Sequence, residues 1–88
     1  MSNDKEDVKR LYSILATINS EEDVEIFFND LCTYKEIESM AQRIKAAQML
    51  MNGSTYEEII KNTNISSATL SRVSKCVKYG QGYKKILK

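Results

Sequence analysis

Apolar residues recur along this chain every three or four positions, which is the spacing of one face of an α-helix. The first two stripes comprise Val8, Leu11, Tyr12, Leu15 and Ile18, and then Val24, Phe27, Phe28 and Leu31. The third stripe comprises Ile37, Met40, Ala41, Ile44, Ala47 and Met51. The 88 residues include no proline and only three glycines, which disfavours a sheet fold with many turns. The pattern therefore predicts a single all-α domain over residues 1–88.

Capping residues divide these stripes into separate helices. The first helix is predicted over residues 4–18, and Ser20 lies directly before three acidic residues as the N-cap of the second. Thr33–Glu36 has the T-x-x-E spacing of a capping box and marks the start of the third helix. Ser54–Glu57 and Thr55–Glu58 both have the corresponding spacing, so either pair can cap the fourth helix. Gly53 follows the third helix, where glycine adopts a left-handed conformation at low cost.

Residues 55–79 show the pattern of two short helices joined by a tight turn, as in a helix-turn-helix. The first is predicted over about residues 56–62, and the second over roughly residues 67–79 with Ser66 as its cap. Asn64 is the predicted left-handed residue of the turn, because asparagine adopts positive φ more readily than most residues. The tail from Tyr83 onward is expected to form one last helical turn.

Aliphatic residues indicate which side of the predicted helix-turn-helix faces the protein core. Ile65 is expected to anchor the turn to the core, and Ile59 and Ala68 to lie where the two helices cross. The complete set of predicted inward residues is Ile59, Ile60, Ile65, Ala68, Leu70, Val73 and Val77.

The opposite side of the second short helix carries hydroxyl groups near its start and cations further along. Hydroxyl groups at the start of such a helix can reach base edges in the major groove of DNA. Lysine and arginine further along can pair with phosphates. The segment is therefore predicted to be a DNA recognition helix. The predicted DNA-binding residues are Thr55, Ser66, Ser67, Ala68, Thr69, Ser71, Arg72, Lys75 and Lys78.

The charge distribution agrees with this prediction. Residues 1–30 carry three basic and eight acidic side chains, whereas residues 31–88 carry ten basic and four acidic ones. Of the two parts, only residues 31–88 therefore carry the net positive charge that favours binding to a polyanion such as DNA. The alternative is a helical protein-interaction module that does not bind DNA, with the acidic part as a docking surface.

Other classes of function find little support in the composition. The chain has no histidine, no glycine-rich phosphate loop and no C-x-x-C, so we expect neither an enzyme nor a metal or cofactor site. Cys32 and Cys76 are isolated and are expected to be free thiols. No apolar run approaches the ~20 residues of a membrane span. The charged N-terminus does not resemble a secretion signal, so we expect a cytoplasmic protein.

Residues 31–80, LCTYKEIESMAQRIKAAQMLMNGSTYEEIIKNTNISSATLSRVSKCVKYG, resemble the central region of the Trp repressor (TrpR) family, and most closely its short TrpR-like YerC/YecD branch. The most specific matches are T-x-x-E followed by Q-R-I, and A-T-x-S-R. The resemblance also implies that Thr55, rather than Ser54, caps the fourth helix. The resemblance implies an all-helical fold and an intertwined homodimer that binds palindromic double-stranded DNA and regulates transcription, most simply as a repressor. A second copy would also supply the core that so short a chain lacks.

The same resemblance implies a pocket for a small-molecule effector. Family members that bind tryptophan hold its carboxylate with two arginines, which match Arg43 and Arg72, and line the pocket with a threonine that matches Thr33. A pocket glycine of these members is Val73 here, and a serine that meets the ligand is Cys76. Valine adds bulk and a thiol is a weak hydrogen-bond partner, so we expect free tryptophan not to be the ligand. The expected effector-pocket residues are Thr33, Arg43, Arg72 and Cys76.

One position of the fourth helix also differs from the family pattern. Glu57 stands where the family places a DNA-contacting arginine. A carboxylate is repelled by phosphates, although it can accept a hydrogen bond from a cytosine amino group. We therefore expect an operator that differs from the best-known operator of the family.

Overall fold

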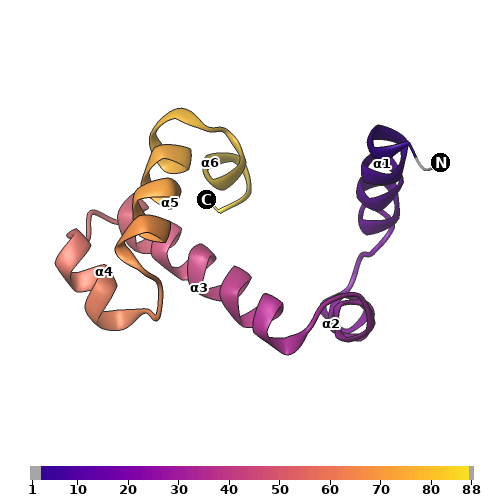
Figure 1. Ribbon diagram of the computed structural model, residues 1–88, viewed down its shortest axis with the longest axis horizontal. Coiled ribbons are helices and arrows are strands. Elements are labelled where there is room, and N and C mark those ends of the chain that lie inside the picture. The colour runs from indigo at the N-terminus through magenta and orange to yellow at the C-terminus, as the bar shows by residue number, and fades with distance from the viewer. Residues whose placement is uncertain (1–2, 88) are drawn as a thin grey trace. The chain divides into compact units, whose positions relative to one another are not determined.

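The computed structural model describes residues 3–87, and all regular secondary structure in that range is helical (Figure 1). The fold class predicted from the sequence is therefore confirmed. Contacts within the chain divide it into two units, one ending at Thr33 and the other beginning at Tyr34. That residues 1–88 act as one domain stays a prediction.

The first unit contains two helices, α1 (Asp4–Leu15) and α2 (Glu21–Leu31). Ser20 caps α2 as predicted, since its Oγ accepts a hydrogen bond from the Asp23 N–H at 3.1 Å. Helix α1 ends three residues earlier than the predicted range of 4–18. There the Thr17 hydroxyl donates to the Ile14 carbonyl at 2.7 Å, a local bond that competes with further helix growth.

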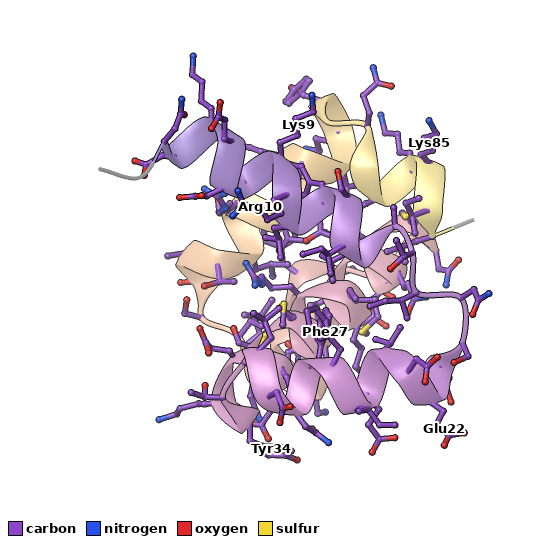
Figure 2. All side chains as sticks on the ribbon, turned by 90° about the vertical axis from the view of Figure 1, so that its right-hand side faces the viewer. Lys9, Arg10, Glu22, Phe27, Tyr34 and Lys85 are labelled. Atoms are coloured by element: carbon purple, nitrogen blue, oxygen red, sulfur yellow. The ribbon has the colours of Figure 1, made fainter. Side chains whose placement is uncertain are left out.

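Neither α1 nor α2 buries a side chain, although both are amphipathic. In Figure 2, Phe27 and Glu22 project from opposite sides of α2. Several large apolar side chains of this unit are exposed, among them Tyr12 at 65% and Ile26 at 58%. Residues 3–33, the described part of the first unit, therefore have apolar surface but no buried core of their own.

The second unit comprises α3 (Tyr34–Met51), α4 (Tyr56–Asn62), α5 (Ser67–Tyr79) and α6 (Gly82–Ile86). Helix α3 begins directly after Thr33, and α4 and α5 begin and end where the sequence predicted. Gly53 has φ of +89° and terminates α3 in a Schellman motif. In this motif the Ser54 N–H donates to the Met49 carbonyl and the Gly53 N–H to the Leu50 carbonyl, at 2.9 and 3.1 Å.

The core of the second unit lies where α4 and α5 pack on α3, and α6 packs against α5 (Figure 1). Its fully buried apolar residues are Ala46, Ala47, Ile59, Leu70 and Val73. The two alanines leave room for close approach of a neighbouring helix, and α5 makes the most extensive contact with α3. Ile65 packs against this core, as predicted for the residue that anchors the turn. Ser74 is also buried, which hydrophobic periodicity did not predict.

Two residues predicted to face the core are instead exposed. Ile60 is 42% exposed, because it lies about 100° around α4 from the fully buried Ile59. Ala68 is exposed because it lies about 200° around α5 from Leu70, on the opposite side of the helix. Close helix packing depends on the alanines of α3 rather than on Ala68.

The turn between α4 and α5 also differs from the prediction. Among the described residues, no residue other than glycine has positive φ, so the left-handed conformation predicted for Asn64 is wrong. The backbone is extended instead, with φ and ψ of −133° and 169° at Thr63 and of −74° and 162° at Ser66. The change of direction is made by extended residues on both sides of the turn.

Gly80 allows the chain to pass tightly from α5 into α6. Its N–H donates to the Cys76 carbonyl at 2.9 Å, and a Cβ at this position would lie 2.6 Å from the same oxygen. Any larger residue would therefore displace the backbone here. Among the residues that the structure describes, no helix is both long and apolar enough to cross a membrane.

Candidate nucleic-acid interface

Helix α5 has one buried face and one exposed face. The buried face consists of Leu70, Val73 and Ser74, followed by the half-buried Val77, at the i, i+3, i+4, i+7 spacing of one helix face. The opposite side of α5 is polar and exposed. Besides Tyr79 at the end of the helix, which is 83% exposed, the exposed residues here are Ser67, Ala68, Ser71, Arg72, Lys75 and Lys78. All six were predicted from the sequence as DNA-binding residues, and the structure brings them together along one helix.

The start of α5 is organised by two hydroxyl groups. Ser66 Oγ accepts a hydrogen bond from the Thr69 N–H at 3.1 Å, which confirms Ser66 as the N-cap. The Ser66 hydroxyl then donates to Thr69 Oγ1 at 3.0 Å. Because Ser66 uses its proton and one lone pair in this cap, Thr69 keeps its own hydroxyl proton available for donation. Thr69 is half-buried and Ser66 is exposed, so the cap lies at the edge of the exposed face.

The cations of α5 come after its hydroxyl groups, as the sequence predicted. Arg72, Lys75 and Lys78 are all exposed, so their charges remain hydrated and are available to an anionic partner. Helix α4, which packs against α5, carries the exposed carboxylate of Glu57 in its first turn. The surface thus combines a cationic helix with a neighbouring acidic residue.

Thr55, the remaining predicted DNA-binding residue, caps α4 in a complete capping box. Thr55 Oγ1 accepts from the Glu58 N–H at 3.2 Å, while the Glu58 carboxylate accepts from the Thr55 N–H at 2.8 Å and from its hydroxyl at 3.0 Å. The hydrogen bond from the Thr55 backbone, and then that from its hydroxyl, hold the pKa of Glu58 below its ordinary value of 4.5. The charged form of Glu58 therefore stabilises the start of α4.

This capping box predicts a specific dependence of stability on pH. Because the pKa of Glu58 is lowered on folding, its contribution is present above pH 4.5 and is lost as the pH falls through the lower folded value. We expect Glu58→Gln to be less stable than wild type at neutral pH, and the difference to shrink at about pH 3. Thermal unfolding followed by circular dichroism at both pH values measures this.

A control for this experiment is Glu57→Gln, which removes the same charge from the same turn without touching the capping bonds. Its difference from wild type should not follow the pattern of Glu58→Gln. If the Glu58→Gln difference is the same at both pH values, the capping role of the carboxylate is wrong.

The four residues expected at an effector pocket have different surroundings. Thr33 is exposed and belongs to the first unit, whereas the others belong to the second. Arg72 is exposed on α5, and Arg43 on α3 and Cys76 on α5 are half-buried. That these four hold a ligand stays a prediction.

Cys76 lines an apolar cavity of about 460 Å³ beside α3, α5 and α6. Neither Arg43 nor Arg72 lines it. The lining residues are Ile44, Cys76, Gly80, Gly82, Tyr83, Ile86 and Leu87. This cavity offers apolar contacts and very little to a charged group. No group of three or more histidine, cysteine, aspartate or glutamate side chains within residues 3–87 is arranged to hold a metal ion.

The amino-acid sequence of this chain is similar to that of a known protein family. The family described as "Trp repressor protein" matches residues 6–88. The chain is 42% identical over 74 residues to the uncharacterised protein YerC of Bacillus subtilis (strain 168), which corresponds to 84% of this chain and 71% of YerC.

Two solved structures share the fold at substantial sequence identity. A TrpR-like protein from Eubacterium eligens ATCC 27750 matches with a TM-score of 0.87 and 35% identity, over 97% of this chain and 92% of the other. A structure from Staphylococcus aureus that is named for the Trp repressor matches with a TM-score of 0.85 and 37% identity, over 91% of this chain and 81% of the other.

Proposed function

Because the chain belongs to the Trp repressor family, we propose that it is a sequence-specific DNA-binding transcriptional regulator, and a repressor, that reads duplex DNA with α5. The observation that carries the proposal is the division of α5 into a buried aliphatic face and an exposed face of hydroxyls and cations. A helix anchored from behind in this way can enter the major groove.

The chemistry of the exposed face matches the two kinds of contact that DNA requires. Ser67, Thr69 and Ser71 offer hydroxyl groups near the start of α5, which can donate to or accept from base edges directly or through water. Arg72 follows Ser71 directly, Lys75 lies about one turn further along, and both suit phosphate oxygens. Contacts to base edges would determine which DNA sequence is bound, and contacts to phosphates would supply most of the affinity.

Selection of bound duplexes from a random pool, followed by a salt titration on the selected sequence, tests the proposal. We expect a defined sequence to be enriched, and its affinity to fall linearly with the logarithm of salt concentration. The alternative function, a protein-interaction module, predicts no enriched duplex and no salt-dependent binding. That outcome would falsify the assignment as a DNA-binding regulator.

We also propose that the chain acts as a homodimer. The support is the first unit, whose helices α1 and α2 bury no side chain yet expose large apolar residues. Exposed apolar surface of this kind is stabilised when a second copy covers it. The predicted contact residues are Tyr12, Leu15, Phe27, Phe28 and Leu31. In such a dimer, two copies of α5 would read half-sites roughly 34 Å apart in a palindromic operator.

Phe27→Asp should shift this dimer toward monomers, because it introduces a charge on the apolar side of α2. Light scattering at micromolar concentration should give about twice the chain mass of 10.1 kDa for wild type, and a lower average mass for the variant. Asn29→Asp adds the same charge at an exposed position of α2 and should remain dimeric. Wild-type protein that is monomeric under these conditions would contradict the dimer.

Free L-tryptophan is not expected to be the effector. Val73 is almost completely buried in the core, and Cys76 offers a weak hydrogen-bond partner where tryptophan-binding members have serine. Added bulk and a lost hydrogen bond each cost about 1–3 kcal/mol, a large part of the roughly 8 kcal/mol of a micromolar complex. Calorimetric titration with L-tryptophan should show no saturable heat, and tight saturable binding would reverse this expectation.

A further inference from the structure

We propose that Gln42 of α3 is a positioning residue, whose side-chain carboxamide holds the turn between α4 and α5 and thereby sets the orientation of α5. The observation is a tertiary hydrogen bond: the Asn64 backbone N–H donates to Gln42 Oε1 at 3.0 Å, across 22 positions of the sequence. The proposal rests on the proposed function, since it concerns how α5 is presented to DNA.

The extended turn creates the need for this bond. Thr63 and Ser66 both have extended backbone angles, so the residues between the two helices lie outside the regular i→i−4 pattern of either one. The Asn64 N–H is therefore a donor without a partner inside either helix, and every such donor needs a partner in the fold or in water. Gln42 is half-buried, and its amide oxygen satisfies the Asn64 donor. Because the partner is an N–H group, the oxygen and not the nitrogen of the carboxamide must face it.

The other contacts that hold the turn, among the described residues, do not include a directional bond to α3. The Thr63 hydroxyl donates to the Ile59 carbonyl at 2.7 Å, a bond that stays within α4 and its end. The side chain of Ile65 packs against the core, and apolar contact is non-directional. The bond from Asn64 to Gln42 is directional and joins the turn to α3, the longest helix of the unit.

The position of Gln42 links this bond to the start of α5. Gln42 and Asn64 line a groove of about 310 Å³ together with Ser66 and Thr69, the two residues of the α5 cap. Ser66 lies only two residues after Asn64, so a displacement of the turn would move the first turn of α5 with it. Ser67 and Thr69, two of the three hydroxyl residues proposed to meet base edges, lie in that first turn, whereas Arg72 and Lys75 lie further along. Loss of the bond should therefore impair discrimination between sequences more than general attraction to DNA.

Three variants test the proposal in the full-length protein. Gln42→Met keeps the length and helix propensity of the side chain but removes the acceptor, whereas Gln42→Glu keeps an acceptor oxygen. Gln48→Met is the matched control, because it makes the same substitution at an exposed position of the same helix. Hydrogen exchange of the Asn64 amide, measured by NMR, reports the bond without any DNA. Affinities for a selected duplex and for an unrelated duplex, measured at one salt concentration, give the discrimination ratio.

We expect Gln42→Met to lose protection of the Asn64 amide and to reduce the discrimination ratio by about 5- to 10-fold, the worth of one hydrogen bond. Gln42→Glu should retain amide protection and the ratio, although its charge lowers both affinities together. Gln48→Met should match wild type in both measurements.

The possible failures are distinguishable. If Gln42→Met is folded and loses Asn64 protection but keeps its discrimination ratio, the positioning role is overturned while the proposed function stands. Retained Asn64 protection in Gln42→Met would show that the bond does not hold the turn, and would overturn the inference in the same way. Wild-type protein that binds neither duplex would overturn the proposed function and this inference with it.

Discussion

Replacing both Arg72 and Lys75 with alanine is expected to weaken DNA binding by roughly 10- to 100-fold, to a similar extent for selected and unrelated duplexes. Both side chains are exposed on the cationic part of α5 and are proposed to contact phosphates. Each phosphate contact contributes about 0.9 to the slope of log affinity against log salt concentration, so the slope should fall by about two. Fluorescence anisotropy over a range of salt concentrations measures both quantities.

The matched control removes two positive charges from α1. Lys5 and Lys9 are exposed there, so replacing both with alanine changes the net charge by the same amount. If binding depended only on net charge, the two double variants would weaken it equally. We expect the α1 variant to keep nearly the full salt slope. Equal losses in the two variants would contradict the assignment of the phosphate contacts to α5.

Truncation of Ile59 to alanine is expected to destabilise the protein by about 2–5 kcal/mol. Its side chain is 0% exposed and lies in a core that contains only five fully buried apolar residues. Small domains have a total stability of about 5–15 kcal/mol, so this loss removes a large fraction of it. Urea denaturation followed by circular dichroism measures the change, with the protein concentration held constant because the proposed dimer would make stability depend on concentration.

The neighbouring isoleucine provides the control for this substitution. Ile60→Ala removes the same atoms from the same helix, but Ile60 is 42% exposed. We expect it to cost less than about 1 kcal/mol, since the site leaves no closed cavity. Equal effects at the two positions would mean that α4 is rotated about its axis, so that Ile59 and Ile60 are buried to the same extent. Such a rotation would also change which side of α5 is presented to DNA.

Together, these experiments separate the attraction of α5 to DNA from its support. Arg72 and Lys75 lie on the exposed face, and their removal should leave the core intact. Ile59 is the buried residue of α4, and its side chain lies in the core. Its truncation should reduce the population of folded protein before it affects any DNA contact. Binding measured at low temperature, where a destabilised variant is still folded, distinguishes the two effects.

Several features of this protein could be predicted from the sequence because they depend on neighbouring residues. The caps at Ser20 and Ser66 are formed by hydrogen bonds that span three residues, so their spacing is visible in the chain itself. The same spacing fits both Ser54 and Thr55, and only the family resemblance indicated the Thr55 cap that the structure shows. The left-handed Gly53 and the ends of α4 and α5 follow from local backbone preferences in the same way. The exposed polar face of α5 follows from helical periodicity.

Other features were decided only by tertiary packing. Ile59 and Ile60 are adjacent and chemically identical, so only the position of α3 determines which of them is buried. Ala68 is small and apolar enough for either side of α5, and the seating of Leu70 and Val73 on α3 leaves it exposed. Asn64 does not have positive φ, and a glutamine 22 residues earlier accepts its N–H. Such contacts join parts of the chain that have no fixed spacing in sequence, and for that reason periodicity and capping rules cannot reveal them.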